Sequence, residues 1–513
     1  MTIQLPHNSA GCSVTTPRIC YEIFVRSFCD SNDDGIGDLN GITSRLDYLQ
    51  DLGIEAIWLT PIQPSSTYHK YDVMDYYGID PEYGTQDDFR RLLSGVHARG
   101  MKLYMDLVIN HTSVQHPWFE QARMGANDPY RNFYWWMTPA MIDALGVKKR
   151  EETADAHVIF PWHDNPGDPE KYYAMFWKGM PDLNYESEAL REEIYKIVRY
   201  WLTEVGVDGF RLDAARHIYP PWLREKNIDF WEEFGQVVKA AKSDAHTVGE
   251  VWAKAKEVAP YFKGLKANFH FDLSFAIQRI IRTGKDQGLV KKEQGIIEKL
   301  REDYSIFGTH NPDFVDATML TNHDQNRIGS VAGASINKMK LAATMLLTLP
   351  GQPYIYYGEE IGMLGVKPDQ HIREPFLWTD RPDDPGRTRW IEPLYSRSGV
   401  VRSAEAQLAD ADSLLNHYKR LIALRKKYPA LSQIRRPNLA PVAGQDKKII
   451  AYVRTHPTEP ILVIHNISGR TRRVDLGEAA AAFTKILFQT NVEKTLSLQK
   501  LMVPAYGSLV LGK

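Results

Sequence analysis

The chain has 513 residues, of which 43% are hydrophobic and 25% are charged, and its formal net charge is −2. This composition excludes an intrinsically disordered chain and allows a large core, in several domains or in one large barrel with additions. Because there is no basic excess, we expect no nucleic-acid partner and no binding to a membrane surface.

The N-terminal segment and the cysteines bear on location. No apolar run reaches the roughly 18 residues that span a bilayer. The start, MTIQLPHNSAGCSV, lacks the charged first part and the apolar core of a signal peptide. The three cysteines, Cys12, Cys20 and Cys29, are odd in number. We therefore expect no disulfide framework and a cytoplasmic location, or a secreted one if a signal peptide has been removed.

The first part of the chain alternates strands and helices. Apolar runs predict strands over residues 20–28, 55–61 and 102–110. Leu46, Leu49 and Leu52 recur at helical spacing before Gly53, which is a typical helix end. A second helix is expected to begin at Thr85, capped together with Asp88, and to end at Gly100.

Later runs extend this pattern. Five more strands are predicted over residues 208–215, 246–252, 268–275, 316–324 and 352–360. Near-continuous apolar strands between amphipathic helices are typical of a parallel sheet. Eight such strands predict an α/β chain folded as a (β/α)8 TIM barrel.

Two segments depart from the alternation. Residues 112–188 are long, irregular and aromatic, which favours a small inserted domain after strand three. After a predicted helix over 414–431, short alternating runs predict an antiparallel β-sandwich. The predicted division is a barrel over 1–111 and 189–430, an insert over 112–188 and a C-terminal domain over 431–513.

Three carboxylates follow predicted strands: Asp213, Glu250 and Asp324. In such a barrel, polar residues at the C-terminal ends of strands are candidates for catalysis. Arg211 shares a strand face with Asp213 and can keep that carboxylate ionised as a nucleophile. The apolar neighbours of Glu250 would raise its pKa and keep it protonated as a general acid, the combination that a retaining glycosidase needs. A single Asp at a strand end is more often a solvated or capping residue. Only the presence of all three carboxylates on barrel strands therefore indicates catalysis.

The segment 30–38, DSNDDGIGD, is similar to the calcium loop of an EF-hand. Its expected metal ligands, at loop positions one, three, five, seven and nine, are Asp30, Asn32, Asp34, the Ile36 carbonyl and Asp38. The twelfth position needs a bidentate Glu but holds Gly41, and a strand rather than a helix precedes the loop. We therefore expect no regulatory EF-hand here.

Several strings carry a resemblance to a known family. They are DLVINH (106–111), MPDLN (180–184), GFRLDAARH (209–217), GEVW (249–252) and LTNHD (320–324). In this order they resemble the signature regions of the α-amylase family of glycoside hydrolases, in a form intermediate between oligo-1,6-glucosidase-type and neopullulanase-type members. The resemblance covers nearly the whole chain and implies an inserted domain B and a C-terminal β-sandwich domain.

The resemblance implies a role for each matching residue. Asp213 would be the nucleophile of a covalent glycosyl-enzyme, Glu250 the general acid/base and Asp324 the stabiliser of the transition state. The residues expected to bind substrate are Tyr71, Asp72, His111, Arg211, Arg216, His217, His323, Asp369 and Arg373. Lys70, in YHKYD, stands where the family often has glycine, so the cleft rim beside Tyr71 is expected to differ.

The resemblance also implies metal ions. Asn110, Asp182 and the backbone carbonyl of His217 match a structural Ca²⁺ site between barrel and domain B, although a further acidic ligand of that site has no match. The loop 30–38 resembles a metal loop found after the first strand in α-glucosidase-like members. It is predicted to bind Ca²⁺, with Mg²⁺ as the alternative.

The favoured function is retaining hydrolysis of α-1,4-glucosidic bonds in starch-type glucans and maltooligosaccharides by a monomer. MPDLN and the histidine of ARH favour an α-amylase, whereas Asp72 favours enzymes of short oligosaccharides. The alternative is an α-glucosidase or 4-α-glucanotransferase. Inactive transporter subunits with the same barrel lack the carboxylates and carry a membrane helix, so that class is disfavoured.

Overall fold

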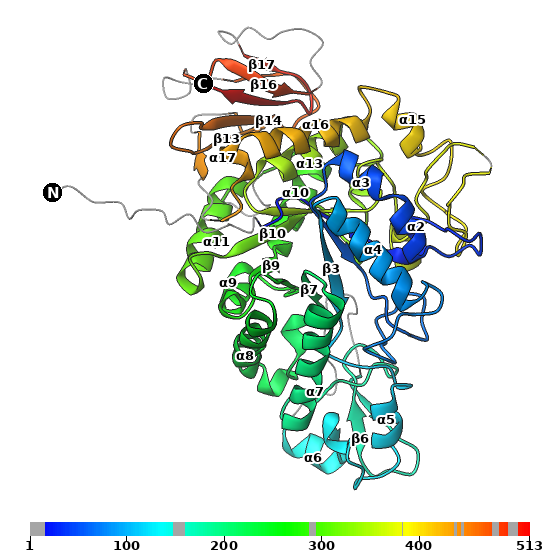
Figure 1. Cartoon of the computed structure of the whole chain (residues 1–513). Coiled ribbons are helices and arrows are strands. Elements are labelled where there is room, and N and C mark those ends of the chain that lie inside the picture. Colours follow the sequence, from blue (N-terminus) through cyan, green and yellow to red (C-terminus); the bar gives the residue numbers. More distant parts are fainter. Residues whose placement is uncertain are drawn as a thin grey trace, which may run out of the picture.

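The computed structural model describes residues 16–146, 160–286, 294–381, 383–435, 439–442, 446–474, 482–490 and 501–513. Eight parallel strands close a barrel in the order β1-β11-β10-β9-β8-β7-β3-β2 (Figure 1). They are β1 (Cys20–Ile23), β2 (Ala56–Leu59), β3 (Lys102–Leu107), β7 (Gly209–Leu212), β8 (His246–Gly249), β9 (Ala267–Phe269), β10 (Val315–Met319) and β11 (Gln352–Tyr356). The predicted (β/α)8 barrel is confirmed.

Helices lie between these strands and cover the outside of the barrel (Figure 1). The longer ones are α4 (Gln86–Ala98), α7 (Glu188–Arg199), α8 (Lys226–Ala241), α10 (Phe271–Thr283), α11 (Ile296–His310), α13 (Ile336–Thr348) and α16 (Leu414–Lys427). The short ones are α1 (Val25–Phe28), α2 (Leu39–Ser44), α3 (Leu46–Leu52), α9 (Ala255–Val258), α12 (Ile328–Val331), α14 (Asp369–Ile372), α15 (Ala404–Leu408) and α17 (Pro429–Ser432).

Local sequence signals determine where the first helices begin and end. Gly53 closes α3 with a φ of 96°, in the left-handed region that glycine adopts without a steric penalty. Thr85 and Asp88 form the expected capping box at the start of α4, each side chain accepting a hydrogen bond from the other's backbone N–H. Later in the chain, α16 ends at Lys427 and a separate helix α17 begins at Pro429, so the predicted helix over 414–431 is two helices.

Two predicted strands are wrong in their second halves. The run 20–28 is a strand only as far as Ile23, where β1 ends, and residues 25–28 form the short helix α1. The run 268–275 was expected to be a single strand, but β9 ends at Phe269 and α10 begins at Phe271. Ile277, Ile280 and Ile281 are buried along one face of α10. This helical period continues back through the run, and apolar residues of a short segment do not distinguish strand from helix.

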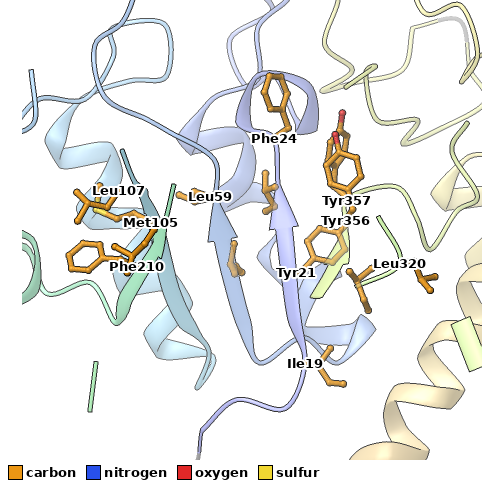
Figure 2. Close-up of a cluster of buried hydrophobic side chains, with 14 of the residues drawn as sticks. Ile19, Tyr21, Phe24, Leu59, Met105, Leu107, Phe210, Leu320, Tyr356 and Tyr357 are labelled. Atoms are coloured by element: carbon orange, nitrogen blue, oxygen red, sulfur yellow. The ribbon is translucent and has the colours of Figure 1, made fainter. Parts of the chain in front are cut away.

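The barrel strands bury both of their faces. Cys20, Trp58, Tyr104 and Tyr354 belong to one cluster, which includes residues from seven barrel strands and fills the barrel interior. The residues on alternate positions, such as Tyr21, join a larger cluster with helix residues between barrel and helices (Figure 2). Burial on both faces explains why the strand runs read as near-continuously apolar.

An insert follows β3 and contains its own small sheet, ordered β4-β6-β5. Its elements are α5 (Pro117–Ala122), β4 (Trp136–Met137), α6 (Pro139–Ala144), β5 (Trp162–Asp164) and β6 (Lys171–Tyr173). Figure 1 shows the insert at the opposite end of the molecule from the C-terminal sheet. The domain boundaries at 112, 189 and 431 stay predictions.

The C-terminal region is antiparallel, as predicted, with a five-stranded sheet in the order β12-β13-β14-β18-β16 and a two-stranded sheet of β15 and β17. The strands are β12 (Leu439–Pro441), β13 (Ile449–Arg454), β14 (Ile461–Asn466), β15 (Arg472–Arg473), β16 (Lys485–Gln489), β17 (Met502–Val503) and β18 (Ser508–Gly512). One of the short alternating runs that predicted strands in this domain, residues 496–504, lies partly outside the described residues.

Two further expectations concern the whole chain. Among the described residues, no helix has both the length and the apolar character needed to cross a membrane. Cys20 and Cys29 are buried free thiols, and Cys12 lies outside the described residues.

Candidate active site

Three barrel strands deliver the predicted carboxylates to one cavity. Asp213 follows β7, Glu250 follows β8 and Asp324 comes after β10. All three line a cavity of about 230 Å³. The structure therefore brings together the three side chains that the sequence placed at strand ends.

Arg211 lies at the centre of this group and is completely buried. Its Nη1 is 2.7 Å from Asp213 Oδ1 and 2.9 Å from Asp106 Oδ1, and its Nη2 is 2.8 Å from Glu250 Oε1. One guanidinium therefore orients three carboxylates, including the predicted pair on one strand face. Asp106, on β3, opens the motif DLVINH and was a candidate as a polar residue at a strand end, but it was assigned no role.

The environment separates the proton affinities of the carboxylates. Burial, together with the nearby Asp213 and Asp324, raises the pKa of Glu250 to about 8 even though Arg211 acts to lower it. Burial also acts to raise the pKa of Asp324, but His323 and Arg373 outweigh it and lower that pKa to about 2. At neutral pH the cavity therefore contains a protonated Glu250 and an ionised Asp324, which supports distinct chemical roles.

Tyr71 and the histidines form the floor beside Asp106. The Tyr71 hydroxyl lies 2.6 Å from His323 Nε2 and 3.0 Å from Asp106 Oδ2. His111 Nε2 lies 3.1 Å from the Tyr71 carbonyl oxygen. Glu22 Oε1 lies 2.5 Å from His323 Nδ1 and orients that ring from below.

Glu22 is a residue that the sequence reasoning missed. It lies on β1 and is 1% exposed. A charged residue in the middle of the apolar run CYEIF was the available signal, because a buried carboxylate needs a partner or a function.

Arg373 closes another side of the cavity. Its Nη2 donates to Asp324 Oδ1 at 2.8 Å and to Asp369 Oδ2 at 3.3 Å. Asp369, Arg373 and His217 all line the cavity, as predicted. His69, Phe176, Trp177, Met180 and Trp252 line it as well, and none of these was among the predicted site residues.

Four predicted substrate residues do not line this cavity: Asp72, Arg211, Arg216 and His323. Arg211 and His323 are fully buried and contact the lining residues Asp213 and Tyr71. Asp72 is 1% exposed and accepts hydrogen bonds from the hydroxyls of Ser65, Ser66 and Thr67. Arg216 is engaged with Glu257 at 2.6 Å and with the Trp252 carbonyl oxygen at 3.1 Å. The positions of Asp72 and Arg216 follow from loop geometry after the strands, which residue spacing does not encode.

Lys70, the departure from the family motif, is a buried anchor under the loop that carries His69 and Tyr71. Its backbone φ is 65°, which a non-glycine residue adopts only at a cost. The side chain is 3% exposed, and Nζ contacts Asp80 at 2.8 Å and Glu82 at 2.6 Å. The ion pairs offset the backbone strain and fix the rim of the cavity beside Tyr71.

The loop 30–38 offers oxygen ligands of the kind that Ca²⁺ prefers, but they are engaged within the loop. Asp30 accepts backbone hydrogen bonds from Asn32, Asp33 and Gly35. Asp38 caps α2 through Gly41 N and also accepts hydrogen bonds from Ser31, so its oxygens are engaged in the same way as those of Asp30. The donor chemistry of Asp30, Asn32, Asp34, Asp38 and the Ile36 carbonyl fits a hard cation.

The second predicted metal site has two of its ligands side by side. Asn110 Nδ2 donates to the His217 carbonyl oxygen at 2.5 Å. Asp182 pairs with His111 through an isolated bridge between barrel and insert, and its Oδ1 accepts from Met175 N. The described residues contain no group of three or more His, Cys, Asp or Glu placed to hold a metal ion. The predicted ligands would offer Ca²⁺ an amide oxygen, a carboxylate and a carbonyl oxygen, which are ligand types that this ion accepts. They do not form a cluster of charged side chains.

Family models, similar sequences and a solved structure all indicate the same family for this chain. A family model described as the alpha amylase catalytic domain matches residues 22–434, and one described as the alpha-amylase SusG C-terminal domain matches residues 449–510. Alpha-amylase 3 of Dictyoglomus thermophilum is 45% identical over 88% of this chain and 84% of its own length. The 4-alpha-glucanotransferase of Thermotoga neapolitana is 34% identical over 88% of this chain and 96% of its own length.

A solved structure agrees with these matches. The alpha-amylase from H. orenii superposes with a TM-score of 0.85 at 40% identity, covering 96% of this chain and 99% of its own. The family match spans the barrel, the insert and the strands that carry Asp213, Glu250 and Asp324. The chain therefore belongs to the alpha-amylase family and is a glycoside hydrolase of that family.

Proposed function

We propose that the chain cleaves α-1,4-glucosidic bonds in starch-type glucans and maltooligosaccharides with retention of configuration. The observation that carries this proposal is that Asp213 and Glu250 lie in different electrostatic environments within one cavity. Asp213 is ion-paired with Arg211 at 2.7 Å, while the pKa of Glu250 is raised to about 8. A retaining glycosidase needs such an ionised nucleophile beside a protonated acid.

In the proposed first step, Asp213 attacks the anomeric carbon while Glu250 donates its proton to the glycosidic oxygen, which leaves as a hydroxyl. Glu250 then takes a proton from water, and that water breaks the glycosyl–Asp213 bond. Asp324 would stabilise the positive charge on the ring between these states. The contact of one guanidinium with both Asp213 and Glu250 supports the short separation of a retaining pair.

The substrate would be held by the residues around these carboxylates. Tyr71 would provide the surface under the sugar, and His111 and Arg373 would contact its hydroxyls. Arg211 and His323, which are fully buried, would act by positioning Asp213 and Tyr71. His217 would contact the leaving-group side. Asp72 and Arg216 would act indirectly, through the loops that they hold.

The second candidate is an α-glucosidase or 4-α-glucanotransferase, which shares the first half-reaction. It is favoured by the relative from Thermotoga neapolitana, whose name is 4-alpha-glucanotransferase. The two readings differ in whether water or a sugar hydroxyl attacks the glycosyl-enzyme, which depends on how acceptor sugars bind.

Product analysis separates these candidates. Maltoheptaose, maltose, isomaltose and starch are incubated with the enzyme, and the products are followed from the earliest times. We expect mixed shorter oligosaccharides from internal cuts. Glucose released from chain ends would favour the α-glucosidase, and products longer than the substrate would favour the glucanotransferase.

We also propose structural Ca²⁺ at Asn110, Asp182 and the His217 carbonyl, and Ca²⁺ or Mg²⁺ in the loop 30–38. When bound, the ions would order the insert and the first loop and would take no part in the chemistry. Removal of metal by a chelator is expected to lower the melting temperature, and the Asp34→Ala variant should lose one bound ion by elemental analysis. Unchanged metal content in that variant would rule out the loop site.

We further propose a monomer in a reducing, cytoplasmic compartment. The free thiols of Cys20 and Cys29 support the compartment. Light scattering of the purified enzyme tests the oligomeric state, and a dimer mass would contradict it.

A further inference from the structure

Trp177 is more exposed than the other described aromatic residues of the insert except Phe160, which is 56% exposed but does not line the cavity. The Trp177 side chain is 42% exposed, whereas Phe119, Tyr134 and Trp135 are buried in the core of the insert. In the described part of the chain, the Trp177 ring pairs with no other aromatic ring and its Nε1 has no hydrogen-bond partner. The packing of the described part of the insert therefore does not account for this indole.

The backbone beneath Trp177 is shaped to hold the ring. A Cβ added at Gly179 would lie 2.2 Å from the six-membered part of the indole, so the ring lies against the glycine backbone. The preceding Phe176 packs edge-on against His111 and His217, with ring centroids 5.4 Å and 5.9 Å apart. One side of the indole is thus supported, and the segment that carries it is fixed to the site.

Trp177 is also the wall between two hollows. One is the cavity of about 230 Å³ that contains the three carboxylates. The other, of about 220 Å³, lies in the insert and is lined by polar groups that include Arg123, Asp164, Asn165 and Lys178. An exposed indole between two such hollows offers an apolar face and a free N–H donor to a ligand that crosses from one to the other.

We propose that Trp177 is a binding platform for a glucosyl unit beyond the one held at the carboxylates. The α-glucan would run from the cavity across the indole toward the hollow in the insert. The apolar face of a pyranose would stack on the ring, and its hydroxyls would meet the polar groups of the second hollow. This inference rests on the proposed function, since it assigns a further subsite for the same substrate.

The test compares substrates of increasing length. Trp177→Ala is assayed on a series from the shortest maltooligosaccharide that the enzyme cleaves up to maltoheptaose. We expect kcat/KM to fall about tenfold for maltoheptaose and less than twofold for the shortest substrate, with Trp177→Phe restoring most of the loss. An equal loss at every length, or no loss at any length, overturns the proposal.

A matched control and a binding assay complete the test. Tyr77 is 39% exposed and does not line the cavity, so Tyr77→Ala should leave kcat/KM unchanged for all lengths. If the enzyme cleaves no α-1,4-glucan, the proposed function fails, and titration calorimetry with maltoheptaose then tests the platform separately. Asp213→Asn should bind about tenfold more tightly than Asp213→Asn/Trp177→Ala. Equal affinities would overturn the platform.

Discussion

The molecule contains two buried clusters of charge that differ in their balance. At the catalytic cavity, one guanidinium, that of Arg211, is shared by Asp106, Asp213 and Glu250. Between β9 and α11, His270 lies 3.4 Å from Asp303 and 3.1 Å from Asp316, and Lys299 adds a second cation on Asp303.

The balance decides what each cluster can do. In the first cluster, burial raises the pKa of Asp106 to about 7 and that of Glu250 to about 8, because Arg211 only partly offsets it and the neighbouring carboxylates add to it. In the second cluster the carboxylates outweigh the effect of burial on His270 and raise its pKa to about 10, so the cluster is paired charge for charge. Burial alone does not mark an active site; a charge imbalance that opens onto a cavity does.

The largest expected effect comes from removing a charge at the cavity. Asp213→Asn should lower kcat by about 10⁴-fold or more, because the amide cannot act as the nucleophile. The substitution is nearly isosteric, so the fold should be unchanged. Steady-state kinetics on maltoheptaose measures the fall in kcat, with circular dichroism to verify folding. Nearly unchanged kcat would assign the nucleophile to another residue.

The raised pKa of Glu250 predicts a pH dependence. A general acid works only when protonated, so kcat/KM should fall as pH rises through about 8. Glu250→Gln should lower kcat by about 10²–10³-fold and abolish this alkaline limb. For an aryl glycoside whose leaving group needs no proton, kcat/KM should be much less affected, because it reports the first step, in which Glu250 acts as the acid. An equal loss of kcat/KM on both substrates would contradict the acid role.

The balanced cluster should affect stability without affecting chemistry. His270→Gln leaves Asp303 and Asp316 short of a cation and should cost about 3–5 kcal/mol of unfolding free energy, with kcat unchanged. Because the folded pKa is raised above its ordinary 6.5, the stabilisation is complete below about pH 6.5 and is lost as pH rises through about 10. Urea unfolding across this range measures it, and a pH-independent difference from the variant would refute the pairing.

Substitutions of Lys70 should have smaller effects, on both the stability and the activity of the enzyme. Lys70→Met removes the ion pairs and keeps the strained φ, which should cost about 2–3 kcal/mol and lower kcat/KM about tenfold as His69 and Tyr71 shift. Lys70→Gly should be less destabilising, since glycine adopts this φ freely. Arg90→Met, which breaks the exposed pair with Asp87, is the control and should cost under about 0.5 kcal/mol. Equal stability of the two Lys70 variants would exclude backbone strain.

The barrel and the carboxylates could be predicted from the sequence because their signals are local. Strands buried on both faces read as apolar runs, and the two-residue spacing of Arg211 and Asp213 places both on one side of β7. Loops after the strands carry no such period. The hydrogen bonds of Asp72 to the hydroxyls of Ser65, Ser66 and Thr67, and the exposure of Trp177, depend on loop conformations that no sequence period encodes.

The sequence predicted the wrong element where the preferences for strand and for helix were nearly equal. The run 268–275 contains aromatic and apolar residues that suit either a strand or a buried helix, and only packing against the barrel decides between them. Glu22 was missed because its partner His323 lies 301 residues away, beyond any pattern that a local reading detects.

The contact between Glu22 and His323 also bears on how the enzyme is made. β1 pairs with β11, and the backbone N–H of Tyr357 donates to the Glu22 carbonyl oxygen at 2.9 Å. At about 5–20 residues per second, a ribosome needs roughly 15–60 s to synthesise the intervening chain. During that time the first strand is finished but unpaired on one edge, and the buried carboxylate of Glu22 has no partner. Catalytic competence therefore arrives late in synthesis, when the last strand closes the ring.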